Sequence, residues 1–301
     1  MILLVVSTAL AGDFWAGGGV AGRGFFTPSS GYLGSAEAEA DGLYNSDVIN
    51  ARVDIDFTAV YAPEFGVTEV PPDVPVINIV RPEWAMIEAH GDSWAARGGI
   101  INASFGLEDW DDWMLYMPTH GQYFAVSPGR MAGSEFGYTL GNGVTLTIGG
   151  GYDLDFESST VEANVNYEAD SWGTWSGVAV YPELDTYEAV IGAEAYPHEA
   201  LTLALGGMGG MAGESPFALG SLYAVVLPEG IVSPTARFEG AFDPDGYTGA
   251  STWNVAIGGA VKPVDWAKLS VEAKVSGSAD VVEPGAYFSL SLFVPQPEEE
   301  E

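Results

Sequence analysis

The chain has 301 residues, of which 47% are apolar, 42 are acidic and only 9 are Lys or Arg, so its net charge is −33. The apolar share excludes a disordered chain, and the acidic balance excludes nucleic acid as a partner, because phosphate binding needs a basic surface. Cysteine is absent, which excludes a disulfide scaffold and thiolate metal sites.

The amino-terminal residues resemble an export signal. Residues 2–11 read ILLVVSTALA and end on Ala9-Leu10-Ala11, the small-x-small pattern of a signal-peptidase site. The run is far shorter than the ~20 residues of a spanning helix, and the usual positive charge at its start is missing. We expect residues 1–11 to be a signal peptide with a truncated or misplaced start; the alternative is a buried first strand.

The most informative pattern is an alternation of apolar and polar residues with period two. From Ile49 to Tyr61 every odd position is apolar, whereas the even positions carry Asn50, Arg52, Asp54, Asp56 and Thr58. Successive side chains of a strand point to opposite faces. The segment therefore predicts a strand with one apolar face and one polar, largely charged face.

The same alternation returns further along the chain. From Val144 to Phe156 the apolar face ends on Phe156 and the polar face carries Asp153 and Asp155. From Val161 onward the polar face carries Glu162 and Glu168. Many strands of ~10 residues without a separate core-filling element are typical of a membrane barrel that is apolar toward lipid and polar toward its lumen.

The whole chain divides into about fifteen segments of this kind. They are Ser35–Asn45, Val48–Ala62, Val76–Ala89, Trp94–Phe105, Ser134–Leu140, Val144–Phe156, Thr160–Ala169, Thr174–Tyr181, Thr186–Tyr196, Ala200–Met208, Ala218–Leu227, Ile231–Phe242, Ser251–Val261, Trp266–Ser276 and Ala286–Val294. Outer-membrane barrels have an even number of strands. We therefore predict an all-β fold, a closed antiparallel transmembrane β-barrel of about 12–16 strands, as a single domain over residues 12–294.

The connections support antiparallel hairpins. Asn45-Ser46-Asp47, Gly141-Asn142-Gly143 and Pro263-Val264-Asp265 are short links, and Asn-Gly is the strongest short hairpin signal. Longer links lie at Pro63–Asp73, Gly106–Gly133 and Glu214–Phe217. Short turns at one end and long loops at the other are typical of an outer-membrane barrel. Residues 295–301 are expected to be a solvated acidic tail, since like charges repel.

A resemblance to a known family arises after residue 97. Gly99 and then Phe105-Gly106-Leu107-Glu108 precede a stretch rich in Asp and aromatic residues, a Pro-Gly turn and a return strand of small residues. This resembles a family of β-barrel porins whose strand reads GxFxTPFGLE, although Ala103-Ser104 stands where that family favours Thr-Pro. The resemblance covers about a sixth of the chain. It implies a passive channel in the bacterial outer membrane and no catalytic residues.

The polar positions of the alternating strands are the candidate pore lining. They are Glu37, Glu39, Asp41, Arg52, Asp54, Asp56, Asp153, Asp155, Glu162 and Glu168. Like charges facing each other across a sheet are destabilising, so these carboxylates need water between them or a cation such as Arg52, Arg97 or Lys274 across from them. The alternative is the solvated face of a soluble sheet.

A second candidate is an acidic loop within residues 107–118. Its carboxylates lie beside Trp110 and Trp113, and they are Glu108, Asp109, Asp111 and Asp112. If the loop folds inward, these groups form a constriction that selects cations. If it stands outside, they are an exposed acidic loop with its Trp residues at the membrane surface.

No catalytic, metal or cofactor site is predicted. His90, His120 and His198 lack metal-ligand spacing, and no nucleophile motif surrounds them. Asp243-Pro244-Asp245-Gly246 could donate oxygens to calcium, but it lacks the rest of a calcium-binding loop and reads as a turn. No Lys follows the glycine clusters, so no phosphate-binding loop is present.

These observations predict a porin-like channel in the bacterial outer membrane for passive diffusion of small hydrophilic solutes, favouring cations. The expected partners are the lipid bilayer and the solutes, and a homo-oligomer is left open. The rival interpretation is a secreted or surface-layer all-β protein with a structural or adhesive role. Its apolar strand faces would pack into a sandwich, and it would stay soluble without detergent.

Overall fold

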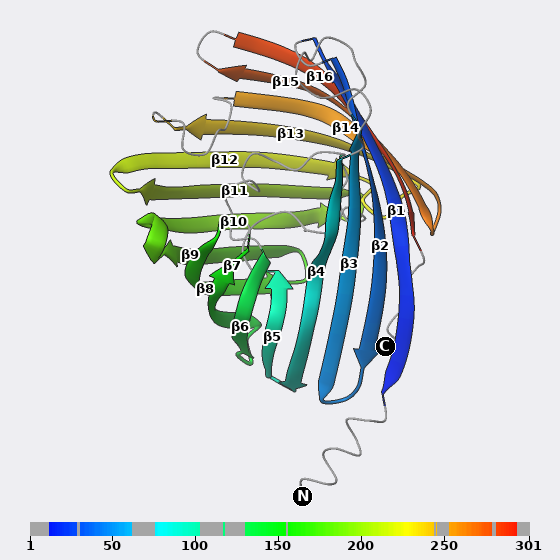
Figure 1. Ribbon diagram of the computed structural model, residues 1–301. Helices are drawn as coiled ribbons and strands as arrows, with labels where there is room; N and C mark the ends of the chain where they lie inside the picture. Colours follow the sequence, from blue (N-terminus) through cyan, green and yellow to red (C-terminus); the bar gives the residue numbers. More distant parts are fainter. Residues whose placement is uncertain are drawn as a thin grey trace, which may run out of the picture.

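A computed structural model describes residues 12–28, 31–61, 76–102, 117, 130–154, 156–243, 245, 253–278 and 281–293. These residues form sixteen strands in one closed barrel (Figure 1). The predicted fold class is confirmed, and the strand number lies at the upper end of the predicted range. Within the described ranges, no helix is long and apolar enough to cross a membrane.

The strands follow one another with short or long connections but no crossovers. They are β1 (Asp13–Thr27), β2 (Gly31–Asn45), β3 (Ile49–Tyr61), β4 (Val76–Gly91), β5 (Trp94–Asn102), β6 (Arg130–Thr139), β7 (Val144–Asp153), β8 (Ser158–Ala169), β9 (Trp172–Tyr181), β10 (Thr186–His198), β11 (Leu201–Ala212), β12 (Ser215–Val226), β13 (Val232–Phe242), β14 (Trp253–Val264), β15 (Ala267–Ser278) and β16 (Val281–Phe293). The short 3-10 helix η2 (Pro182–Leu184) joins β9 to β10.

The barrel closes through its first strand. β1 pairs antiparallel with β2 on one side and with β16 on the other, from Gly19 opposite Phe293 to Phe26 opposite Ala286. In Figure 1 the blue β1 therefore adjoins the red β16. A direct pairing of residues 35–45 with 286–294 would also have closed the sheet, but β1 lies between them. The sequence DFWAGGGVAGRGFFT of β1 is rich in Gly, which hides its alternation.

Hairpin turns and long loops lie at opposite ends of the barrel. Connections alternate between the two ends because every strand pair is antiparallel. One end has only short links, the longest being residues 227–231 between β12 and β13. The other end carries residues 62–75 and 103–129, where the sequence predicts long links, and also residues 243–252, where it predicts only a turn at Asp243–Gly246. The segment Glu214–Phe217 is no long loop, since Phe217 already belongs to β12.

The two faces of the strands differ sharply in chemistry. Large apolar side chains stand on the outer face, where Ile87, Ile191 and Ile257 are 64%, 68% and 65% exposed. Charged side chains one residue out of phase point inward, where Asp54 is 0% and Glu162 is 1% exposed. An outer face of this kind would be unfavourable in water, whereas it suits a hydrocarbon environment.

One sector of the inner wall is apolar. Tyr181, Val190, Met208 and Phe217, on β9 to β12, form a buried cluster with Ala179 and Leu219. Phe156 also packs against this cluster, in an edge-on contact with Tyr181 at 5.4 Å between ring centroids. The alternation placed Phe156 on the outer face. That prediction is wrong because β7 ends at Asp153, and the phase of the strand is lost in the turn that follows.

Candidate functional site

The lumen is the candidate functional site, because the closed barrel gathers its charged side chains there. Among the residues that the structure describes, we consider three groups of interacting charged residues that line it. Two lie on strands β2 to β8, and the third lies on β13 to β15. β5 and β13 face each other, since seven strands lie between them in either direction around the ring.

The first group is on β2 and β3. Asp41 is opposite Asp54 in the strand register, and carboxylate oxygens of Glu39, Asp41 and Asp54 all lie within 4.8 Å of one another. Such a spacing of oxygens could hold a cation. Arg52 supplies one positive charge, since its guanidinium lies 2.9 Å from the Asp54 carboxylate. The group is thus an acidic patch that one arginine neutralises in part.

Trp84 on β4 joins the first group to the second. The guanidinium carbon of Arg52 lies 4.9 Å from the centroid of the Trp84 ring, and that of Arg97 lies 5.8 Å from it. Both distances allow cation–π attraction. Two of the few basic residues are thereby held side by side on the inner wall.

The second group centres on Arg97 of β5. Its Nε donates a hydrogen bond of 2.7 Å to Glu135 on β6, and one terminal nitrogen donates to the Asn102 carbonyl at 3.1 Å. Beyond Glu135, Gly149 on β7 is followed by Glu162 on β8 in the same register row. Glu135 is 5% and Glu162 1% exposed. This row brings two buried carboxylates toward one guanidinium.

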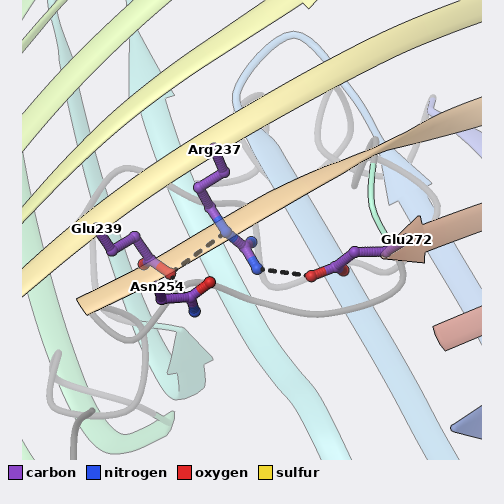
Figure 2. A network of polar contacts seen from close by, with 4 residues as sticks. All are labelled: Arg237, Glu239, Asn254 and Glu272. Carbon is purple, nitrogen blue, oxygen red and sulfur yellow. Dashed lines mark hydrogen bonds and ion pairs between the residues drawn. The ribbon is translucent and has the colours of Figure 1, made fainter. Parts of the chain in front are cut away.

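The third group is on the opposite wall and is drawn in Figure 2. The Arg237 guanidinium lies 3.4 Å from the Glu239 carboxylate and 3.3 Å from that of Glu272. Asn254 donates a hydrogen bond of 2.8 Å to Glu239. All four side chains are at most 3% exposed. Neighbouring atoms therefore cover these charges almost completely.

Outside the strands, the carboxylate of Glu183 is held by hydrogen bonds in the β9–β10 turn. Glu183 of η2 accepts hydrogen bonds from the Ser158 hydroxyl at 2.9 Å, the Ser159 hydroxyl at 2.7 Å and the Ser159 amide at 3.0 Å. The Ser159 hydroxyl, the backbone of Glu183 and the Ser158 hydroxyl hold the pKa of this carboxyl below its ordinary value. The contact fastens the β9–β10 turn to the start of β8.

The candidate pore-lining residues can now be placed. Seven have described side chains on the inner face: Glu39, Asp41, Arg52, Asp54, Asp153, Glu162 and Glu168. Of these, Asp54, Asp153 and Glu162 are buried, and Glu168 is exposed near the end of β8. Glu37 and Asp56 lie in β2 and β3, but their side chains fall outside the described part. Asp155 and the loop carboxylates Glu108, Asp109, Asp111 and Asp112 lie outside the described residues altogether.

Several inward charged residues were not among the sequence candidates. They are Glu88, Glu135, Glu188, Arg237, Glu239, Lys268 and Glu272. Ser233, Thr235, Arg237 and Glu239 alternate with apolar residues in β13, so the period-two pattern could have identified them. Glu135 is harder to identify from the sequence, because its interactions depend on Arg97 and Gly149, which lie opposite it on the neighbouring strands.

Comparison with known proteins supports the architecture. No protein-family model matches the chain, and no curated protein matches it. A triple mutant of the Rhodopseudomonas blastica porin matches with a TM-score of 0.64 at 12% identity, over 94% of this chain and 100% of that one. A trimer form of OmpT, an outer membrane protein of Vibrio cholerae, matches with a TM-score of 0.65 at 11% identity over the same shares. At these identities the likeness shows a shared fold.

Proposed function

We propose that the protein is a channel of the bacterial outer membrane through which small hydrophilic solutes diffuse passively, with a preference for cations. The observation that carries this proposal is the closed barrel with an apolar outer face and a carboxylate-rich inner face. That combination is the architecture of outer-membrane barrels. The fold shared with the Rhodopseudomonas blastica porin supports it.

The cation preference follows from the charges of the inner wall. The chain has 42 acidic residues against 9 basic ones, and Arg52, Arg97 and Arg237 are each occupied by carboxylates. A narrow channel with low-dielectric walls concentrates the field of the remaining carboxylates. Cations are therefore enriched in the lumen, and anions are opposed.

The loop between β5 and β6 is proposed to narrow the channel. Met117, the described residue of that connection, is only 1% exposed. A buried methionine fits a loop that packs against the protein better than one standing in water. An inward loop would bring Asp109, Asp111 and Asp112 close to the solute path, where charged rings set selectivity.

The apolar outer face argues against the rival function, a secreted all-β structural protein. In a sandwich the apolar strand faces pack against each other, whereas here they form the exposed outside of a closed barrel. We likewise propose no enzymatic role, because none of the inner groups combines a nucleophile with a base and an orienting partner. Whether copies of the chain associate, as OmpT does in its trimer form, is tested by the mass of the protein–detergent complex.

The function is tested by reconstitution into planar bilayers. In a gradient of potassium chloride the reversal potential should report a preference for potassium over chloride. The preference should fade as salt rises, because the screening length falls to ~3 Å near 1 M. Small single-channel conductance is expected from the covered inner wall. Anion preference at low salt, or no conductance at all from a folded barrel, would contradict the proposal.

A further inference from the structure

The inner wall holds two neighbouring acidic side chains beside a single guanidinium, that of Arg97, which pairs with one of them. Glu135 and Glu162 belong to β6 and β8, and Gly149 of β7 lies between them in the register. A Cβ atom at Gly149 would lie 2.6 Å from Cγ of Glu135 and 3.0 Å from Oε1 of Glu162. Both acidic side chains therefore converge over the space that this glycine leaves open.

Glu162 is the unusual member of the pair. Its side chain is 1% exposed. Glu135 and Asn164 adjoin its carboxyl group, but neither carboxylate oxygen has a partner in good hydrogen-bonding geometry. The nearby Thr160, two residues earlier on the same face of β8, is 2% exposed and its hydroxyl also lacks a partner. A buried carboxylate without partners is strongly unfavourable. A further group that interacts with the oxygens of Glu162 and Thr160 would therefore stabilise this part of the wall.

Arg97 does not supply what is missing. Arg97 donates hydrogen bonds to Glu135 and to the Asn102 carbonyl. It interacts with Glu162 only through longer-range electrostatic attraction. Along the same register row, Ala179 of β9 separates Glu162 from Glu188 of β10, which is also buried. Three acidic side chains therefore share one guanidinium in this row, and a bound divalent cation would compensate those that are ionised.

We propose that Glu135 and Glu162 bind a calcium ion on the inner wall of the barrel, with the Thr160 hydroxyl as a further oxygen ligand. Calcium takes carboxylate and neutral oxygens in flexible geometry, whereas magnesium requires a near-ideal octahedron and gives up water reluctantly. A crowded, nearly covered site with carboxylates from two strands therefore fits calcium better than magnesium. The ion would join β6 to β8 across the glycine of β7.

The test is calorimetric titration of the refolded, chelator-treated barrel in detergent with calcium chloride. The wild-type protein should take up one ion per barrel. Glu162→Gln keeps the shape of the side chain and should weaken binding at least about tenfold, since affinity depends on the ligand charge. Glu194→Gln removes a half-buried inward carboxylate of β10 outside this row and should leave binding unchanged.

A second pair of variants tests the role of the glycine. Gly149→Ala places a methyl group between the two carboxylates and should weaken calcium binding, whereas Gly240→Ala, with no atom within 4 Å of the added Cβ, should not. Calcium should also raise the unfolding temperature of the wild-type barrel, and of Gly240→Ala, but not that of Glu162→Gln.

Several results would overturn the calcium site. They are the absence of binding by wild-type protein up to about 1 mM calcium, the weak end of protein calcium sites, equal binding by Glu162→Gln, and magnesium binding as strong as calcium binding. Proton uptake without metal binding would show that the carboxylates share a proton instead. If Glu162→Gln fails to fold, Gly149→Ala decides the matter, because wild-type binding alone does not separate this site from the oxygens of Glu39, Asp41 and Asp54. Because no ion flow is measured, a failure here is distinct from a failure of the channel function.

Discussion

Arg237 on β13 and Glu272 on β15 form an ion pair of 3.3 Å in which both side chains are 0% exposed (Figure 2). The pair spans β14, which lies between the two strands. Water is excluded from both charges, so each depends on charged and polar neighbours, including Glu239 beside Arg237, for compensation.

Removal of Arg237 should therefore destabilise the barrel strongly. Arg237→Met leaves Glu239 and Glu272 buried without their guanidinium, and the loss of one member of a buried pair costs about 3–5 kcal/mol. Lys262→Met, at an exposed position near the end of β14, should change stability by no more than about 0.5 kcal/mol. Urea unfolding of the barrel in lipid vesicles measures both. Equal stability of the two variants would mean that the ion pair contributes nothing.

The outer face should tolerate charge according to depth in the bilayer. Ile191 lies in the middle of β10 and is 68% exposed, whereas Tyr187 is near the start of that strand on the same face. Ile191→Arg should cost ~2–4 kcal/mol near the bilayer midplane, and Tyr187→Arg only ~0–1 kcal/mol near the interface. Reversible unfolding from vesicles gives both values. A barrel that stays folded in water without detergent, with no difference between the two variants, would remove the membrane assignment.

The Glu183 turn should make stability depend on pH at the acidic end. Hydrogen bonds from Ser159 and Ser158 lower the pKa of this carboxyl in the folded state. Its stabilising effect is therefore fully present above the ordinary glutamate pKa of about 4.3 and is lost as the pH falls through the lower folded value. Glu183→Gln should be less stable than wild type at pH 7, and the gap should shrink toward pH 3. Glu214→Gln, in another exposed turn at the same end, should show no such change.

The fold could be predicted where one face of a strand is charged. In β3 the alternation around Arg52 and Asp54 fixes the strand and its inner face. It fails in β1, where glycines remove the contrast between faces. It also fails where both faces are apolar, since nothing in the sequence around Val190 and Met208 separates an inward apolar cluster from the outer surface.

The candidate site was less predictable than the fold, because its contacts join distant strands. The period-two alternation alone places Asp54 and Glu162 on the inner face, but the neighbours of Glu162 depend on the register of β6, β7 and β8. The role of Gly149 is invisible without that register. The charged residues of β13 are different. Arg237 and Glu239 follow the same period-two alternation, so the sequence alone is enough to place them on the inner face.

The loop between β5 and β6 offers the sharpest test of how the channel selects its solutes. Met117 in this connection is buried, which supports a loop that packs inward and carries Asp109, Asp111 and Asp112 with it. Their joint replacement by Asn should then sharply reduce the preference for potassium over chloride. If the loop stands outside, its charges are screened within ~8 Å at physiological salt and the preference should barely change.

The control for this loop is a second acidic loop at the same end of the barrel. Asp243 and Asp245 lie in the connection between β13 and β14, and their replacement by Asn should alter selectivity little. Deletion of residues 107–118 should also raise the single-channel conductance, because a loop that narrows the lumen limits the flow of ions. Unchanged conductance after the deletion, together with unchanged selectivity after the triple replacement, would remove the constriction and leave the barrel wall as the source of selectivity.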